Sequence, residues 1–190
     1  MTIIEHLGDY HRFHCCSDNV TIHMVKHIVG DLYPVKPSWL KKIPGLFTLN
    51  ERVVLSGTWK DDLFFSYVPV GAFNVGSINL NINDDIATNQ KKHDADVWYK
   101  NDKENAWTNN NSNLEDSLQA VKDEQAPFIK KYVQKFAKGE EVRYNKGDEI
   151  GYFSFGSTVV LVFEAPNFKF NVQSDQKIKF GESLGDFVSN

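Results

Sequence analysis

Short segments of alternating or continuous apolar residues recur along the chain and predict β-strands. Residues 20–28 (VTIHMVKHI) and 74–82 (NVGSINLNI) alternate in part between apolar and polar positions. Residues 46–56, 63–71 and 157–164 are rich in the aliphatic and aromatic side chains that fit a half-buried pleated surface. Glycine and proline punctuate the intervals between these segments. We therefore expect a mainly β (α+β) fold of antiparallel or mixed, sandwich-like sheets.

The pattern changes in residues 84–124. This stretch holds ten acidic and five basic residues and seven asparagines, so we expect a solvated, Asn-rich insertion that is part loop and part helix. Between Pro127 and Gly139, apolar residues then recur at helical spacing, with proline in the first turn and glycine beyond the end. These signals predict one or two helices near 114–137.

A seven-residue motif occurs twice in the last third of the chain. GDEIGYF (147–153) and GESLGDF (181–187) share the order Gly-acid-x-aliphatic-Gly-x-Phe. Each copy reads as a turn in which glycine adopts an unusual backbone angle before a strand begins. We expect two related hairpin layers that pack face to face, as in the flattened β-sandwiches of lipoyl and biotin carriers.

Composition narrows the class of protein. A length of 190 residues with 41% hydrophobic and 24% charged residues fits one soluble domain over residues 1–190. A net charge of −4 argues against a nucleic-acid partner. We expect neither a targeting nor a membrane-spanning segment in this chain, because no basic start precedes an apolar core and no apolar run is long enough. Cys15 and Cys16 are adjacent, which favours two free thiols and no metal site.

Two histidines stand out near the start. DYHRFH (9–14) places His11 and His14 three residues apart around an arginine. Histidine acts as acid, base or ligand near neutral pH, but residues three apart on a strand point to different sides. One site therefore need not hold both. His23 and His27 fall inside a strand pattern, and we interpret them as structural.

A second candidate is the tripeptide Gly156-Ser157-Thr158, which opens the apolar run that follows it. A serine hydroxyl can attack the open carbonyl of the preceding glycine, which is the first step of peptide self-cleavage. A nucleophilic serine of a hydrolase is an alternative, although the Gly-x-Ser-x-Gly elbow is absent around Ser157. A carrier module is a further alternative, because EAPNFKF (164–170) faintly resembles a lipoyl-carrier tip around Lys169.

Five motifs taken together resemble phosphatidylserine decarboxylase in the form found in mitochondria and many bacteria. In chain order they are DYHRFH (9–14), GDLYPVKP (30–37), PGLFTLNERVVL (44–55), VPVGAFNVGSI (68–78) and KGDEIGYFSFGSTVVLVFEAP (146–166). The resemblance covers residues 9–83 and 138–188. Five ordered motifs are far more specific than any one of them.

The resemblance implies that the chain is a proenzyme that cuts itself between Gly156 and Ser157. The family motif is Leu-Gly-Ser-Thr, and Phe155 stands here in place of the leucine. Cleavage would give a β chain that ends at Gly156 and an α chain that begins at residue 157. Ser157 would become a pyruvoyl group, the self-derived cofactor and electron sink for decarboxylation of phosphatidylserine to phosphatidylethanolamine.

By motif, His14 matches the family histidine that acts as base for self-cleavage, and His11 matches the one linked to substrate handling and protonation. The implied partners are phosphatidylserine and a membrane surface, with peripheral association at the mitochondrial inner membrane; a homodimer is left open. Trp39, Leu40 and Phe64 are candidate membrane contacts, with core or rim packing as the alternative for each.

Some positions depart from the family. Members carry an Asp-His-Ser triad whose aspartate precedes the histidine motif by many residues, so we expect no counterpart of that carboxylate here. Neither Asp9 nor Asp18 matches its motif. Without it, an inactive chain of the same fold that does not process itself is the alternative to an active decarboxylase. Residues 15–19, CCSDN, also replace the proline and glycine-containing turn usual after the second histidine.

Overall fold

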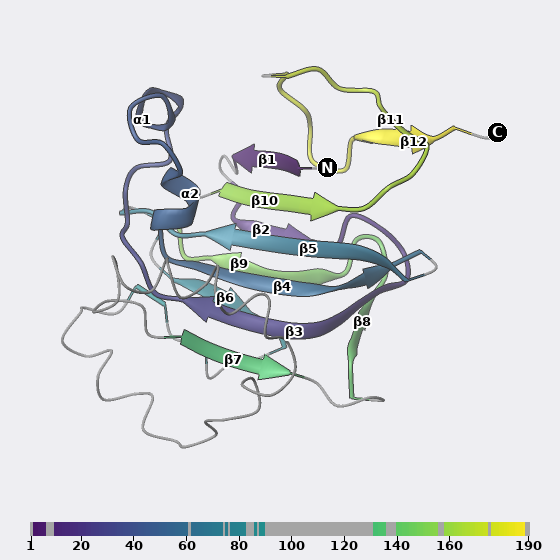
Figure 1. The fold of residues 1–190 in the computed structure, drawn as a ribbon, viewed down its shortest axis with the longest axis horizontal. Coiled ribbons are helices and arrows are strands. Elements are labelled where there is room, and N and C mark those ends of the chain that lie inside the picture. Colours follow the sequence, from purple (N-terminus) through teal and green to yellow (C-terminus); the bar gives the residue numbers. More distant parts are fainter. Residues whose placement is uncertain are drawn as a thin grey trace, which may run out of the picture.

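The regular secondary structure in the computed structural model of the chain is mostly antiparallel β-strand, with two short helices (Figure 1). This confirms the mainly β class. The structure describes residues 2–6, 10–60, 62–73, 75, 77–82, 86, 88–89, 131–135, 140–155, 158–174 and 176–188. No helix in these ranges is long and apolar enough to cross a bilayer.

The largest sheet contains seven strands in the order β1-β10-β5-β4-β3-β7, and β8 also pairs with β3. Their bounds are β1 Thr2–His6, β3 Val20–Ile28, β4 Arg52–Trp59, β5 Leu63–Val70, β7 Lys131–Lys135, β8 Val142–Tyr144 and β10 Thr158–Phe163. The predicted strands at 20–28, 63–71 and 157–164 are thus confirmed almost to the residue. The apolar run after the Gly-Ser-Thr tripeptide lies between β1 and β5.

A three-stranded sheet lies behind β5, β4 and β3 in Figure 1. It consists of β2 (Arg12–His14), β9 (Glu149–Phe153) and β6 (Ile78–Leu80). The ring of Phe13 stacks on Tyr67 of the large sheet at 5.8 Å between centroids and contacts Phe153 at 5.1 Å. The core therefore lies between the two sheets. His14 is the last residue of β2, and His11 immediately precedes this strand.

The C-terminal residues form a separate hairpin of β11 (Phe168–Phe170) and β12 (Gly185–Phe187). Lys169 lies in the middle of β11, opposite Asp186, and not at a hairpin tip. The aromatic neighbours on either side of Lys169 continue the strand. This placement gives no support to the carrier alternative, which needs its lysine at an exposed turn.

Alternation of side chains explains the central strands. In β4 every second residue is buried, so one face meets the core and the other does not. In β3 the alternation shifts at His23, where the register against β4 breaks between Ile22 and Met24. This irregularity is a β-bulge, and it accounts for the merely partial alternation in the sequence.

The repeated glycine motif has the same local structure in both copies. Gly147 and Gly181 have φ angles of 91° and 79°, which side chains other than hydrogen rarely adopt. The second glycines, Gly151 and Gly185, each lie against a carbonyl oxygen and a phenylalanine ring, which come from the two strands beside Gly151 and from the one strand beside Gly185. The turn prediction is confirmed for each motif, and a strand follows each turn as expected.

Replacing Gly151 by alanine should destabilise the three-stranded sheet. A Cβ atom at this position would lie 2.1 Å from the carbonyl oxygen of Asn79 and 2.9 Å from the ring of Phe13. Relieving both overlaps requires β9 to move, so we expect a loss of about 3 kcal/mol in the free energy of unfolding. Urea denaturation measures it. Ser154→Ala, at an exposed position just after β9, is the control, and equal midpoints for the two variants would contradict the crowding argument.

Two predicted elements are wrong in part. Residues 46–49 form the short helix α2 (Leu46–Leu49) where a strand was expected, because Gly45 with φ 71° turns the chain and Asn50 N–H closes the turn on Leu46. The helix predicted near 114–137 is a strand at β7, which pairs along the free edge of β3. Tyrosine and valine suit such an edge, and tertiary pairing overrides the helical spacing. The other helix, α1, is Pro37–Leu40.

Most of the Asn-rich insertion, and the rest of the predicted helix, lies outside the described residues. Two described residues at its start are buried, with Ile86 at 7% and Thr88 at 2% exposure. The Thr88 hydroxyl accepts a hydrogen bond from Ile78 N–H at 2.6 Å. The beginning of the segment is therefore attached to the edge strand β6.

Candidate active site

The predicted cleavage bond lies between two well-fixed flanks. Gly156 and Ser157 themselves are outside the described residues. On one side, Phe155 N–H donates to the Val75 carbonyl at 2.7 Å, and Ser154 N–H donates to Ser77 at 3.0 Å. On the other side, Thr158 is fully buried at the start of β10 and pairs with Val70. The sheets thus hold the chain immediately before and after the bond.

His11 contacts the flank of this bond directly. Its backbone carbonyl accepts a hydrogen bond from Phe153 N–H at 2.8 Å, and its ring lies 5.2 Å from the Phe155 ring between centroids. Its Nδ1 atom is buried and has no hydrogen-bond partner among the described residues. No described neighbour fixes a proton on this nitrogen, and the ring lies beside Phe155, which is two residues before Ser157 in the sequence.

His14 lies in a different environment. Its Nδ1 is 2.8 Å from the Gly147 carbonyl, which can only accept, so Nδ1 carries a proton. In the neutral ring, Nε2 then accepts a hydrogen bond from the Tyr10 hydroxyl, with 2.7 Å between the nitrogen and the oxygen. The ring also stacks on Tyr10 and meets Phe180 edge-on at 5.2 Å. None of these contacts reaches Phe155 or Thr158, so the structure does not bring the two histidines together.

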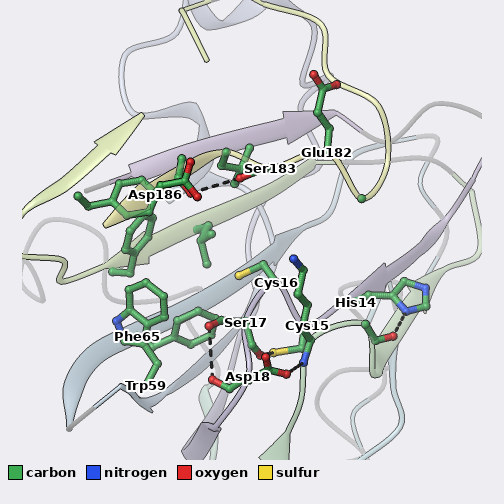
Figure 2. Close-up of a pocket in the computed structure, with 18 of the residues that line it drawn as sticks. His14, Cys15, Cys16, Ser17, Asp18, Trp59, Phe65, Glu182, Ser183 and Asp186 are labelled. Atoms are coloured by element: carbon green, nitrogen blue, oxygen red, sulfur yellow. Dashed lines mark hydrogen bonds between the residues drawn. The ribbon is translucent and has the colours of Figure 1, made fainter. Parts of the chain in front are cut away.

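A pocket of about 710 Å³ opens beside His14 (Figure 2). Its apolar wall is formed by aromatic and aliphatic side chains of the large sheet and of the C-terminal hairpin, chiefly Trp59, Phe65, Phe163 and Phe168. Both positive-φ turns, at Gly147 and Gly181, line it. The repeated motif therefore frames a cavity between the β2 region and the hairpin.

An ion pair fixes β2 against β9 beside His14. Arg12 donates to both carboxylate oxygens of Glu149 at 2.6 and 2.8 Å. This hydrogen bond from Arg12 is the main reason that the pKa of Glu149 is lowered, with a further bond from Asn81. Because the folded-state pKa is depressed, the pair contributes stability at neutral pH and loses it as the pH falls through that lowered pKa. Both side chains are partly exposed, so the contribution is small.

The two cysteines differ sharply in environment. Cys15 is buried, its thiol donates to the Ser17 carbonyl at 3.1 Å, and desolvation raises its pKa to about 11. Cys16 is exposed at the pocket. Free thiols were expected at both positions, and neither is in a disulfide.

Thiol titration should therefore count one reactive group. At pH 8 we expect Ellman's reagent to modify Cys16 within minutes, because a thiolate forms readily only at an exposed thiol. Cys15 should react only after denaturation in guanidinium chloride. Cys16→Ser should remove the fast phase entirely, whereas two thiols that react at the same rate in the folded chain would contradict the assignment.

The structural interpretation of His23 and His27 holds. His23 Nε2 lies 3.1 Å from the Thr58 hydroxyl. His27 is 1% exposed, and its Nε2 lies 2.8 Å from the Glu51 carboxylate. The other oxygen of Glu51 accepts Asn89 N–H at 2.8 Å. This buried pair attaches the segment after β6 to the large sheet.

Sequence reasoning missed the polar residues that brace the end of β5. The Asn50 side chain is fully buried and donates to the carbonyls of Tyr33 and Gly71 at 2.8 and 2.9 Å. The Glu51 carbonyl accepts Gly71 N–H at 2.7 Å. Since Val70 pairs with Thr158, these bonds fix the strand that supports the cleavage flank. The sequence feature that could have identified these residues is the polar triplet Asn-Glu-Arg inside the apolar run LFTLNERVVL (46–55).

The chain is similar to proteins of known family. Residues 1–186 match the family profile described as Phosphatidylserine decarboxylase. The mitochondrial phosphatidylserine decarboxylase proenzyme 1 of Candida albicans is 42% identical over 95% of this chain, and that of Saccharomyces cerevisiae is 41% identical over 96%. The mitochondrial proenzyme of Cricetulus griseus is 38% identical over 94% of it. The matches cover 33%, 31% and 36% of these relatives, so the chain spans about a third of their length.

Proposed function

The chain belongs to the phosphatidylserine decarboxylase family, and we propose that it decarboxylates phosphatidylserine to phosphatidylethanolamine and carbon dioxide at a pyruvoyl group made from its own Ser157. The relatives are named as proenzymes and as mitochondrial. We extend both properties to this chain, as a precursor of a β and an α chain that works at the surface of the mitochondrial inner membrane.

Maturation would proceed through the bond between Gly156 and Ser157. The serine oxygen, relieved of its proton by a base, attacks the glycine carbonyl, and the amide becomes an ester. Removal of the α-proton of residue 157 breaks the carbon–oxygen bond of this ester. Gly156 leaves as a carboxylate, and dehydroalanine remains. Tautomerisation and addition of one water molecule release ammonia and give the pyruvoyl group at the new N-terminus.

The contacts of the two histidines favour His11 as the base. His11 has a nitrogen without a partner among the described residues, and its ring contacts Phe155 next to the bond. His14 already donates to Gly147 and accepts from Tyr10, and its contacts lie at the pocket. The motif resemblance assigned these roles the other way round. We propose the exchange: His11 serves maturation, and His14 serves substrate handling.

The residues around position 157 fit a prosthetic group at a chain terminus. Thr158 is fully buried and pairs with β1 at His6 and with β5 at Val70, so anything attached to its amide is held by a rigid sheet. When present, a pyruvoyl group supplies a carbonyl that withdraws electrons as carbon dioxide leaves, as pyridoxal phosphate does elsewhere. The family match over residues 1–186, together with the Gly-Ser-Thr motif at 156–158 ahead of the buried strand β10, is the observation that carries this proposal.

Mass spectrometry and a carbon dioxide assay test the proposal together. We expect the purified chain to separate under denaturing conditions into a fragment that ends at Gly156 and a fragment that begins with a pyruvoyl-blocked residue 157. Incubation with phosphatidylserine labelled in its carboxyl group should release labelled carbon dioxide, and borohydride reduction should stop the release. A single intact mass of 21.7 kDa with no label released would instead support the alternative of an inactive chain of the same fold.

A further inference from the structure

A basic segment projects from one end of the large sheet. Residues 32–50, here called the basic segment, make up most of the connection from β3 to β4 and include α1 and α2. They contain three lysines and no acidic residue, and Asp31 and Glu51 flank them. Lys36, Lys41 and Lys42 are all exposed. The whole chain has a net charge of −4, whereas the connection between β3 and β4 has a net charge of +1 with Asp31 and Glu51 counted, so it is more basic than the rest of the chain.

Exposed aromatic side chains accompany these lysines. Trp39 lies in α1 between them and is 39% exposed. Phe73 and Phe155, in the turns after β5 and β9, are 75% and 61% exposed. Exposed side chains of this size are costly in water unless another apolar surface covers them.

Contacts place the turns of Phe73 and Phe155 and the base of the basic segment at one end of the molecule. Phe155 N–H donates to Val75, so the turns of Phe155 and Phe73 lie side by side. The base of the basic segment is attached to the same place, since Asn50 donates to the Gly71 carbonyl. Figure 1 shows α1 and α2 at the end of the sheet where β5 finishes and β10 begins. Phe155 and Thr158, the described residues on either side of the proposed cleavage bond, lie at this end too.

We propose that this end, with Lys36, Lys41, Lys42, Trp39, Phe73 and Phe155, docks on the surface of an anionic phospholipid bilayer. The inference rests on the proposed function in one respect: docking there would bring the position of residue 157 to the headgroup layer in which a phospholipid substrate lies.

The composition of the surface favours a bilayer over other partners. Tryptophan and phenylalanine rings partition into the interfacial region, and lysines beside them are attracted to anionic headgroups. Recognition of nucleic-acid backbones relies on larger basic patches, whereas this segment has three lysines and no arginine. The third candidate from the sequence, Phe64, lies at the opposite end of β5, and the Glu164 carboxylate accepts its N–H at 3.4 Å. That acidic neighbour opposes contact with an anionic surface.

Vesicle flotation tests the docking surface without any substrate. Vesicles of phosphatidylcholine with 30 mol% phosphatidylglycerol contain no serine headgroup, so binding to them is independent of decarboxylation. We expect the chain to float with these vesicles and not with pure phosphatidylcholine. Charge reversal of all three lysines, K36E/K41E/K42E, should lower the partition coefficient by at least about 100-fold.

A second triple variant distinguishes a local effect on the docking surface from a general effect of the net charge of the chain. K169E/K177E/K179E makes the same change in charge at exposed lysines of the C-terminal region. This variant should bind within about threefold of the parent, because only lysines close to the bilayer surface contribute to the attraction. Trp39→Ala should lower binding about tenfold and Phe64→Ala should leave it unchanged. Equal losses for the two triple variants, or for the two aromatic variants, would overturn the proposal.

Fluorescence quenching adds a readout on the unaltered chain. Brominated phosphatidylglycerol should quench tryptophan emission in the parent, and Trp39→Phe, which keeps an interfacial ring, should lose that quenching while it still floats. Absence of quenching in a chain that floats would also overturn the proposal. Loss of docking with normal self-cleavage refutes this inference alone, whereas normal docking with no cleavage refutes the proposed function alone.

Discussion

Ser157→Ala is expected to leave the chain as one species of 21.7 kDa and to abolish the release of carbon dioxide from phosphatidylserine. Alanine has no oxygen to attack the Gly156 carbonyl and no leaving group on its β-carbon, so neither ester formation nor elimination can occur. No pyruvoyl group can then form, and the loss should reach the detection limit of the assay. Intact mass and labelled carbon dioxide measure the two effects on one preparation.

Two controls make this result specific. Ser154→Ala removes an exposed hydroxyl three residues upstream, and its backbone hydrogen bond to Ser77 does not depend on the side chain, so cleavage should continue at the parental rate. Ser157→Cys keeps a nucleophile and should cleave slowly. Labelling of the intact parent at Ser157 by a fluorophosphonate, with carbon dioxide release unchanged in Ser157→Ala, would contradict the proposal and favour the hydrolase alternative.

The sequence predicted those elements that local pattern determines. The apolar run from Thr158 to Phe163 and the alternation in Val20–Ile28 are properties of a strand buried on one or both faces, and both became strands of the large sheet. The turns at Gly147 and Gly181 were predictable because a positive φ angle almost requires glycine. In each case the physical cause lies within a few residues of its effect.

Elements that depend on distant partners were not predictable. Tyr132 and Val133 fit a helix and a strand equally well by local preference, and the free edge of β3 decided between them. Asn50 is polar beside an apolar run, and only the fold brings the Tyr33 and Gly71 carbonyls to its amide. Pattern alone cannot show which long-range contacts satisfy a buried polar group.

The histidine pair illustrates the same limit at the site. The motif identified His11 and His14 as the candidates, and their spacing predicted that they need not share one site. The motif could not indicate which of the two rings would find hydrogen-bond partners. The irregular register between Phe13 and His14 places one ring beside Phe155 and the other at the Gly147 turn. Roles transferred by motif therefore need the local contacts before they are assigned.

His11→Gln is expected to slow the appearance of the two fragments by about 10²–10⁴-fold, whereas His14→Gln should change that rate by less than about tenfold. A general base acts on the serine proton in the transition state, and we assign this task to His11, whose Nδ1 has no hydrogen-bond partner among the described residues and whose ring lies beside Phe155. The His14 ring can lose its bonds to Gly147 and Tyr10 without any loss of a base near Ser157. Quantitative gel densitometry after expression in a cell-free system gives both rates.

The two substitutions should also separate maturation from turnover. His14→Gln chains that have cleaved should carry the pyruvoyl group and yet turn over phosphatidylserine more slowly, since the histidine at the pocket is then missing from substrate handling. His11→Ala should regain cleavage in added imidazole, because a small base can enter the space that the ring vacates, and a merely unfolded chain would not respond. If His14→Gln blocked cleavage and His11→Gln did not, the motif-based assignment would hold and the exchange of roles would be refuted.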